Sequence, residues 1–182
     1  MVRSRSAVPS ESPRSTRQGE RVTRPDSRLP KEGDVELRPL TNTDYEFLVS
    51  LQRQDDVWEF IGTLPLPGEG HAHHLFAIRE GDLPLGFAGL VRSQALDGND
   101  FEVLCAVRSE VQHRGIAKQA CQLVLAWAFQ TAQLDRVIAC IDDSNEPARA
   151  IALKIGMTEL APRPPNRTVY VKYRDERSLT RA

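Results

Sequence analysis

The residues best suited to chemistry lie where a predicted strand gives way to a predicted helix. The apolar run Phe101–Val107 predicts a buried strand, and a helix is expected from Gly115 onward. The first turn of a helix has backbone N–H groups without intrahelical acceptors, and the positive end of the helix dipole lies behind them. Basic side chains surround this turn: Arg108, His113, Arg114 and Lys118. The junction therefore predicts an anion site, and a phosphate-bearing ligand is its natural occupant.

The spacing at this junction excludes two common phosphate-binding motifs. No Gly-Lys-Ser/Thr follows, as a P-loop requires, and only one of the three glycines of the dinucleotide fingerprint is present. The segment instead resembles motif A of the GNAT superfamily of N-acetyltransferases, Gln/Arg-x-x-Gly-x-Gly/Ala. The matching residues are Gln112, His113, Arg114, Gly115, Ile116 and Ala117.

Residues 142–157 resemble a second, downstream segment of the same superfamily, Asn-x-x-Ser/Ala…Lys-x-Gly-Phe, with Met157 in place of the Phe. Asn145 is a good N-cap for a helix that Gly156 would end. The resemblance implies that the Asn145 side chain reaches the pantetheine arm of acetyl-CoA. A plain N-cap is the alternative role, and the two roles are compatible.

The resemblance extends from Val35 to about Tyr173 and implies an acetyl-CoA-dependent N-acetyltransferase acting on a primary amine. The amine would be a protein N-terminus or a small molecule, and it would attack the thioester directly. The spacing from Glu102 to Gln112 looks most similar to the RimJ/RimL-like branch, which acetylates N-termini of ribosomal proteins or other amines. The resemblance implies acetyl-CoA as co-substrate, no metal, and these cofactor-binding residues: Cys105, Ala106, Val107, Gln112, His113, Arg114, Gly115, Ile116, Ala117, Lys118 and Asn145.

Two residues are candidates for proton transfer in such a reaction. Glu102 could act as the base that deprotonates the amine, and the alternative is an outward strand residue with an ion-pair partner. Many relatives protonate the leaving thiolate with a helix Tyr, but Ala152 stands at that position. Tyr170 or Tyr173 could replace it if the last strand directs one of them inward; otherwise the thiolate leaves unassisted. The missing Tyr also motivates an alternative function, a degenerate domain that binds acetyl-CoA as a sensor or scaffold.

Acidic residues after the first predicted helix could attract a cationic amine. Asp55, Asp56 and Glu59 are the candidates, and Trp58 and Phe60 could form apolar walls. A solvated acidic face with core aromatic residues explains the same pattern equally well.

Two further patterns argue weakly for other chemistry. His71, His73 and His74 could ligate a metal, but no Cys or carboxylate spacing completes the site. Cys105 lies in the middle of a strand without a fixed base, which makes it a poor nucleophile.

The order of the predicted elements indicates an α+β domain. It implies the GNAT fold, with a mixed central sheet of six to seven strands and helices on both faces. Strands are predicted at 35–38, 74–79, 85–91, 101–107, 136–141, 157–160 and 169–173, and helices at 41–54, 57–61, 115–131 and 146–155. Residues 81–82 and 97–99 are predicted turns, and 65–70 and 163–167 are predicted loops.

Composition sets the domain boundaries. Residues 1–31 are rich in Arg, Ser and Pro, with eight Lys or Arg against three Asp or Glu, so we expect a disordered basic arm. The arm could bind RNA, the ribosome or an acidic partner, or have no dedicated role. Residues 32–175 form the predicted N-acetyltransferase domain, and 176–182 a flexible C-terminal tail.

The chain as a whole predicts a cytoplasmic protein. Its three cysteines lack the spacing of a disulfide framework, and no signal peptide or membrane-spanning run is evident. With a net charge of −1, neither a membrane nor nucleic acid is expected as a partner. The sheet edge of this fold often pairs, so a homodimer is one expected assembly.

Overall fold

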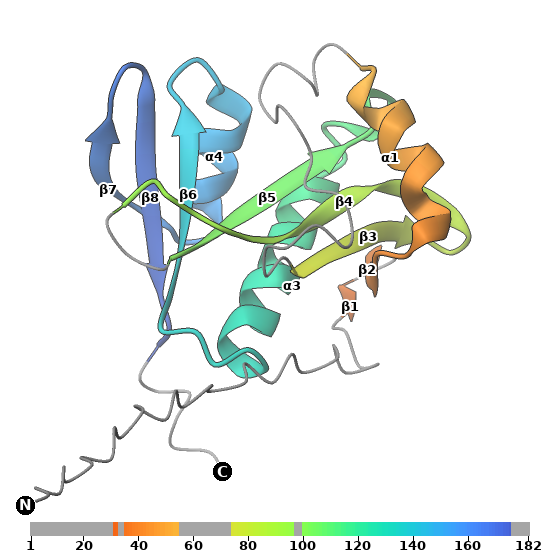
Figure 1. Ribbon diagram of the computed structural model, residues 1–182, viewed down its shortest axis with the longest axis horizontal. Coiled ribbons are helices and arrows are strands. Elements are labelled where there is room, and N and C mark those ends of the chain that lie inside the picture. Colours follow the sequence, from red (N-terminus) through yellow and green to blue (C-terminus); the bar gives the residue numbers. More distant parts are fainter. Residues whose placement is uncertain (1–30, 33–34, 55–73, 97–99, 176–182) are drawn as a thin grey trace, which may run out of the picture.

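The computed structural model describes residues 31–32, 35–54, 74–96 and 100–175 of the 182-residue chain. Helices cover both faces of one central sheet (Figure 1). The strands are β1 (Lys31–Glu32), β2 (Val35–Pro39), β3 (His74–Glu80), β4 (Leu83–Arg92), β5 (Phe101–Val107), β6 (Arg136–Asp142), β7 (Thr158–Arg163) and β8 (Arg167–Tyr173). The α-helices are α1 (Tyr45–Gln52), α3 (Ile116–Gln130) and α4 (Glu146–Lys154), and short 3₁₀ turns cover Asn42–Asp44 and Ser109–Val111.

The sheet has the strand order β1-β2-β3-β4-β5-β6-β8-β7. All neighbours are antiparallel except β5 and β6, which are parallel and are connected through α3. This mixed sheet confirms the predicted fold class. The strand beyond the seven predicted ones is the two-residue β1, where Lys31, placed in the predicted arm, pairs with Glu36.

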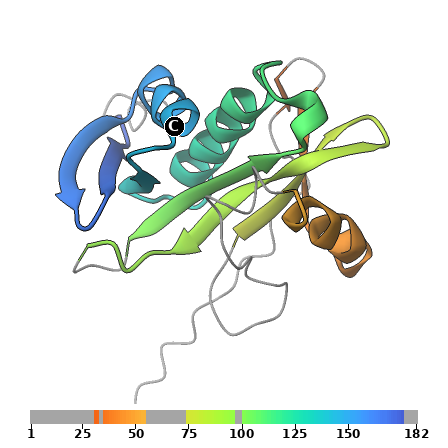
Figure 2. The same ribbon diagram turned by 90° about the horizontal axis from the view of Figure 1, so that it is seen from above.

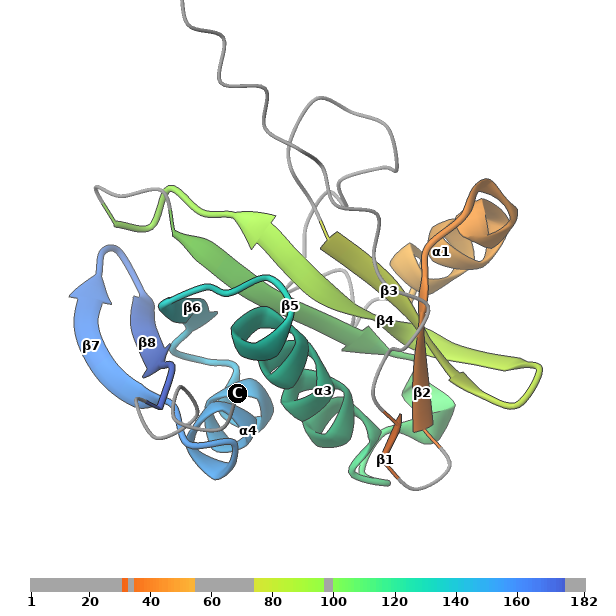
Figure 3. The ribbon, with the colours of Figure 1, turned by 90° about the horizontal axis from the view of Figure 1, so that it is seen from below.

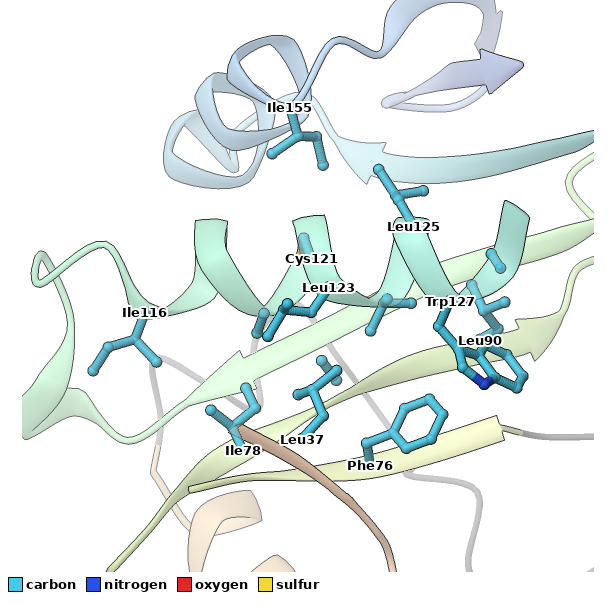
Figure 4. Packing of buried hydrophobic residues seen from close by; sticks show 14 of the residues in the cluster. Leu37, Phe76, Ile78, Leu90, Ile116, Cys121, Leu123, Leu125, Trp127 and Ile155 are labelled. Carbon is cyan, nitrogen blue, oxygen red and sulfur yellow. The ribbon is translucent and has the colours of Figure 1, made fainter. Parts of the chain in front are cut away.

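Two helical layers enclose the sheet, because α3 and α4 lie on one face and α1 on the other (Figures 2 and 3). Ala120, Val124 and Ala128, spaced four residues apart on α3, are completely buried, as the helical period requires of a core-facing stripe. Trp127 packs on the Phe76 ring in the same cluster (Figure 4). A smaller cluster under α1 joins Leu48 and Leu51 to β4 and β5. This clamping of β5 from both faces fixes the strand that leads to the predicted site.

Most predicted boundaries agree with the structure to within a few residues. The 41–54 helix is a 3₁₀ turn followed by α1, and its capping box is present, with Asp44 Oδ2 accepting from Thr41 N at 2.8 Å. The predicted turn at Gly81-Asp82 joins β3 to β4. The predicted 163–167 loop is shorter than expected, because β7 extends to Arg163 and pairs there with Arg167. The predictions for 57–61, 65–70 and 97–99 lie outside the described residues.

No helix in the described part of the chain is long and apolar enough to cross a membrane.

Candidate active site

Strands β5 and β6 pair at one end and separate at the other. In the described ranges their register contains one pair, Glu102 with Ile138. We call the part up to this pair the closed end. The open end is the stretch beyond it, where residues 103–107 of β5 face residues 139–142 of β6. Figure 1 shows the two strands diverging there.

Side chains fasten the closed end. The Asp100 carboxylate, which is buried, accepts two hydrogen bonds from Arg136, from Nε at 2.6 Å and from Nη2 at 2.9 Å. Two residues further along β5, Glu102 Oε1 accepts from the backbone N–H of Cys140 at 3.2 Å. The Glu102 carboxylate thus accepts from an amide of β6 at the point where the strand ladder stops. This hydrogen bond limits how far the separation of β5 and β6 extends.

The backbone of β5 presents unpaired groups to the open end. Arg108 N donates to Leu85 O at 2.8 Å, and Ser93 N donates to Asp100 O at 2.9 Å, so the even-numbered residues of β5 bond to β4. The odd-numbered residues therefore point their N–H and C=O groups toward β6. The Val103 N–H is used in the single pair with Ile138, and among the described residues the amides of Cys105 and Val107 have no strand partner. At these positions an extended ligand could complete the ladder in place of a strand.

A cavity of about 660 Å³ occupies the open end. Successive residues of a strand point to opposite faces, and both sets from β5 and β6 line the cavity, so it is accessible to groups on both faces of the sheet. The lining residues that matter most for chemistry are Glu102, Cys105, Gln112, His113, Gly115, Lys118, Cys140, Asp142, Asn145, Ala152 and Arg167.

The predicted anion site forms one wall of this cavity. Gly115 is the N-cap of α3 with φ of +80°, and His113 has φ of +61°, so both residues take the left-handed conformation that curves the loop around the helix end. A Cβ on Gly115 would meet no atom within 4 Å. The space in front of the helix N-terminus is therefore open, and a phosphate group fits it without displacing protein atoms.

The predicted cofactor residues are brought together with one exception. All line the cavity except Arg114, whose Nη2 instead donates to Glu80 Oε1 at 3.0 Å in an ion pair with β3. Its backbone remains in the loop, but its charge is directed to the sheet. Asn145 caps α4 by accepting from Ala148 N at 3.1 Å and also lines the cavity, so its cap role is present.

Glu102 lies at the junction of the closed and open ends. Besides the Cys140 amide, its carboxylate accepts from Ser93 Oγ at 2.8 Å. Burial raises the pKa of Glu102 above its ordinary value, and the two hydrogen bonds and the charges of Arg167 and Arg163 act against that rise. The carboxyl therefore binds a proton more readily than an exposed glutamate, which suits a base. The predicted alternative, an outward side chain with an ion pair, does not describe it, because within the described residues it forms none within 4 Å.

The geometry does not support the predicted proton donor Tyr170. Its side chain is buried in the core cluster, and its hydroxyl accepts from Arg149 Nε of α4 at 3.2 Å. It is not part of the cavity lining. Tyr173 is more than half exposed at the far end of β8. Alternation along β8 places Tyr170 on the α4 side, which a strand pattern alone could not establish.

Cys105 is unsuited to nucleophilic attack, as predicted from its position. The neighbouring Cys121 thiol raises the pKa of Cys105 well above its ordinary value, and burial raises it further. The thiolate form, which is the reactive one, is therefore scarce at neutral pH.

Several sequence candidates lie outside the described residues: Asp55, Asp56, Trp58, Glu59, Phe60, His71 and His73. His74 is described, and its ring packs 4.9 Å from the Trp127 ring. The described residues contain no group of three His, Cys, Asp or Glu side chains that could hold a metal.

Sequence reasoning missed two residues at the site. Ser93 orients Glu102, and Gln54 Oε1 accepts from Ser109 N at 3.1 Å and so ties the segment after α1 to the loop before the anion site. Arg167, expected in a loop that could close over substrate, is the first residue of β8 and lines the cavity. The contacts of Ser93 and Gln54 depend on how separate elements pack. No local pattern marks them.

Comparison with known proteins identifies the family of this chain. Residues 34–158 match the family model described as an acetyltransferase (GNAT) domain. Among curated protein sequences, none matches this chain. Among solved structures, an acetyltransferase from Agrobacterium tumefaciens is similar, with 20% identity, a TM-score of 0.66, and coverage of 93% of this chain and 99% of that one.

Two further similar structures are of enzymes named for their substrates. A spermidine N-acetyltransferase from Vibrio cholerae, in complex with CoA and spermine, has 15% identity and a TM-score of 0.66 over 78% of this chain and 96% of that one. A ribosomal-protein-S5-alanine acetyltransferase from Vibrio fischeri has 14% identity and a TM-score of 0.64 over 80% of this chain and 96% of that one. At these identities the likeness shows the fold alone.

Proposed function

Because the chain belongs to the GNAT acetyltransferase family, we propose that it transfers the acetyl group of acetyl-CoA to a primary amine, in the manner of the RimJ/RimL-like branch. One observation carries the proposal: a single cavity joins an open anion site, unpaired strand amides and a buried carboxylate. Together these groups could hold a phosphate-bearing thioester and a base for the attacking amine.

The residues present fit acetyl-CoA. The first turn of α3 and Lys118 would hold its pyrophosphate, and the backbone of Cys105 and Val107 would pair with its pantetheine arm. When bound, acetyl-CoA supplies the activated acetyl group. An N–H of β5 near Val107 would donate to the thioester carbonyl and stabilise the charge that develops there. The chain thus contributes orientation and polarisation.

Glu102 would accept the proton that the ammonium must lose. Deprotonating an α-amine with a pKa of about 7.7–8.0 at pH 7 costs about 1 kcal/mol, whereas a Lys amine costs about 4.6 kcal/mol. A carboxylate already committed to two hydrogen bonds is a modest base, so it suits an α-amine better than a Lys side chain. This supports an N-terminal or small-molecule α-amine as the acceptor.

Calorimetric titration of acetyl-CoA and of ATP into the full chain tests the cofactor assignment. We expect micromolar binding of acetyl-CoA that Gly115→Glu abolishes, since that variant puts a negative charge where the pyrophosphate would lie. Gly81→Glu is the matched control: it also has positive φ and open space around its Cβ, but lies in the β3–β4 turn. Absence of acetyl-CoA binding by the folded chain would overturn the proposal.

A second candidate function is binding of acetyl-CoA without turnover. The observation that favours it is Ala152, which faces the cavity where relatives carry the proton-donating Tyr. Release of free thiol from acetyl-CoA in the presence of an amine panel separates the two: amine-dependent release supports the enzyme, and tight binding without release supports the sensor.

A further inference from the structure

The face of the sheet that α3 and α4 leave uncovered carries a distinct set of cavity residues. Ile138 on β6 and Val169 and Val171 on β8 form a core cluster separate from the one under α3, and Cys140 packs against it. By alternation, Asp142 and Arg167, which are cross-strand partners, extend this column to the open end. Amine entering from this face would pass these side chains before reaching Glu102.

Arg167 is the cation of this column, and its charge acts on both Asp142 and Glu102 without a close ion pair to either. Its partner across the strands, Asp142, is engaged elsewhere, because its Oδ1 accepts from Ser144 N at 3.0 Å and Oγ at 2.7 Å, and its Oδ2 from Asn166 Nδ2 at 3.3 Å. Among the residues that the structure describes, no carboxylate oxygen lies within 4 Å of the Arg167 guanidinium. The guanidinium contacts the Cys140 thiol, and because the side chain is exposed and lines the cavity, its remaining N–H groups can reach a ligand.

A second arginine strengthens the positive field on this side. Arg163 is the cross-strand partner of Arg167 on β7, and its Nη1 donates to Ala95 O, which anchors it beside the loop that covers β6 and β8. The charges of both arginines reach Glu102, where they oppose the rise in its pKa that burial causes. The cavity mouth therefore places Arg167 beside Asp142, with Glu102 further in, while Arg163 contributes its charge from the neighbouring strand.

We propose that the acceptor is a primary amine carrying a carboxylate a few atoms from its nitrogen, and that Arg167 binds that carboxylate. The inference rests on the proposed function and names its substrate class. An amine of this kind matches the order of charges in the cavity: its ammonium faces Glu102, and its carboxylate meets a guanidinium that can bond it through two N–H groups.

Two sources supply this chemistry, a free α-amino acid and a peptide that begins with Asp or Glu. The test measures kcat/KM by thiol release from acetyl-CoA with matched acceptors that differ in one charge. A panel of free amino acids is paired with the corresponding carboxamides, Asp-Ala is paired with Asn-Ala, and spermidine represents the polyamines. Preference confined to the first pair indicates a free amino acid, and preference within the second indicates an acidic N-terminus.

We expect the carboxylate-bearing member of at least one pair to exceed its neutral counterpart by about 10–100-fold, the range for a charge-assisted hydrogen bond. Arg167→Met should remove this ratio by lowering kcat/KM for the acid far more than for the amide, and Arg167→Lys should restore part of it. Arg174→Met, which removes a positive charge just beyond the far end of β8, should keep the ratio.

Two outcomes would overturn the assignment, and they are distinguishable. Equal turnover of acids, amides and spermidine, or an acid-to-amide ratio that Arg167→Met leaves intact, overturns the role of Arg167 while the acetyltransferase activity stands. Absence of thiol release with every amine overturns the proposed function and this inference with it. Acetyl-CoA affinity, measured by calorimetry in each variant, identifies any change in the cofactor side of the cavity.

Discussion

The closed and open ends of the β5–β6 pair are built from the same two strands and behave in opposite ways. At the closed end the Asp100–Arg136 ion pair and the Glu102–Cys140 hydrogen bond lie beside the one ladder pair and hold the strands together. At the open end the strands keep their backbone groups unpaired around a cavity of about 660 Å³. The difference teaches that a binding site can be made by stopping a sheet at a defined residue, without a separate pocket-forming loop.

The close approach of β4 to β5 is where the open end is most easily damaged. A Cβ on Gly86 would lie 2.1 Å from Ala106 O, a backbone atom of β5. Because a backbone cannot yield as a side chain does, Gly86→Ala should cost about 3 kcal/mol or more in unfolding free energy and weaken acetyl-CoA binding. Urea denaturation and calorimetry measure the two effects.

Gly89→Ala is the matched control for that change. Its Cβ would lie 2.1 Å from His74 O, so the clash is equal but acts on β3. We expect a similar loss of stability with unchanged acetyl-CoA affinity in the folded fraction. Equal loss of affinity in both variants would contradict a specific role of β5 in binding acetyl-CoA.

Glu102 marks the boundary between the two ends, and Glu102→Gln separates its two roles. Glutamine keeps an acceptor for Cys140 N but cannot take a proton, so kcat should fall about 100-fold while the fold is retained. In the native enzyme the base must be ionised, so kcat falls as pH drops through the Glu102 pKa, and the raised pKa moves that fall above the pH expected of an ordinary glutamate.

The pH profile of kcat at saturating amine is the informative measurement for Glu102. The acidic limb should disappear in Glu102→Gln. If Glu102→Gln retains both the rate and the acidic limb of the profile, Glu102 serves only to hold β5 and β6 together where the two strands separate.

Arg136→Met tests the closed end alone. It leaves the buried Asp100 carboxylate without its ion-pair partner, and we expect a loss of about 1–3 kcal/mol, less than for a fully buried pair because Arg136 is partly exposed. Acetyl-CoA affinity below the unfolding transition should not change. Arg174→Met, whose Asp135 partner is largely exposed, should lose less stability. A loss of affinity in Arg136→Met would show that the two ends are coupled.

The smallest effect concerns Asn145 at the open end. Asn145→Ala removes the N-cap of α4 and should cost about 1 kcal/mol. Asn145→Asp retains the acceptor for Ala148 N and should restore stability. If the amide also donates to the pantetheine arm, acetyl-CoA affinity falls in both variants. Full affinity in Asn145→Asp would leave the residue as a cap.

Local patterns were sufficient for the elements and for the anion site. Strand alternation and the start of a helix at Gly115 each follow from residues close together in the chain, and these predictions agree with the structure to within a few residues. The family resemblance, carried by the segments after Val107 and before Met157, supplied the fold.

Side-chain direction could not be predicted in the same way. Whether Tyr170 points to the cavity or to α4 depends on the register of β8 with β6, which joins residues about 30 positions apart. Arg114 is drawn from the anion site by Glu80, a residue of β3. Arg167 became a candidate only when its pairing with Asp142 placed it at the mouth of the cavity. These contacts arise from the tertiary arrangement, so no sequence period indicates them.

The unpaired amides of the open end have a consequence for exchange with solvent deuterium. Beyond Val103, the N–H groups of Cys105 and Val107 point away from β4, whereas those of Leu104 and Ala106 are bonded to it. In the free protein we expect protection to alternate from residue to residue along this one strand. Bound acetyl-CoA should slow exchange at the odd-numbered amides only, so the strand itself would report occupancy of the site.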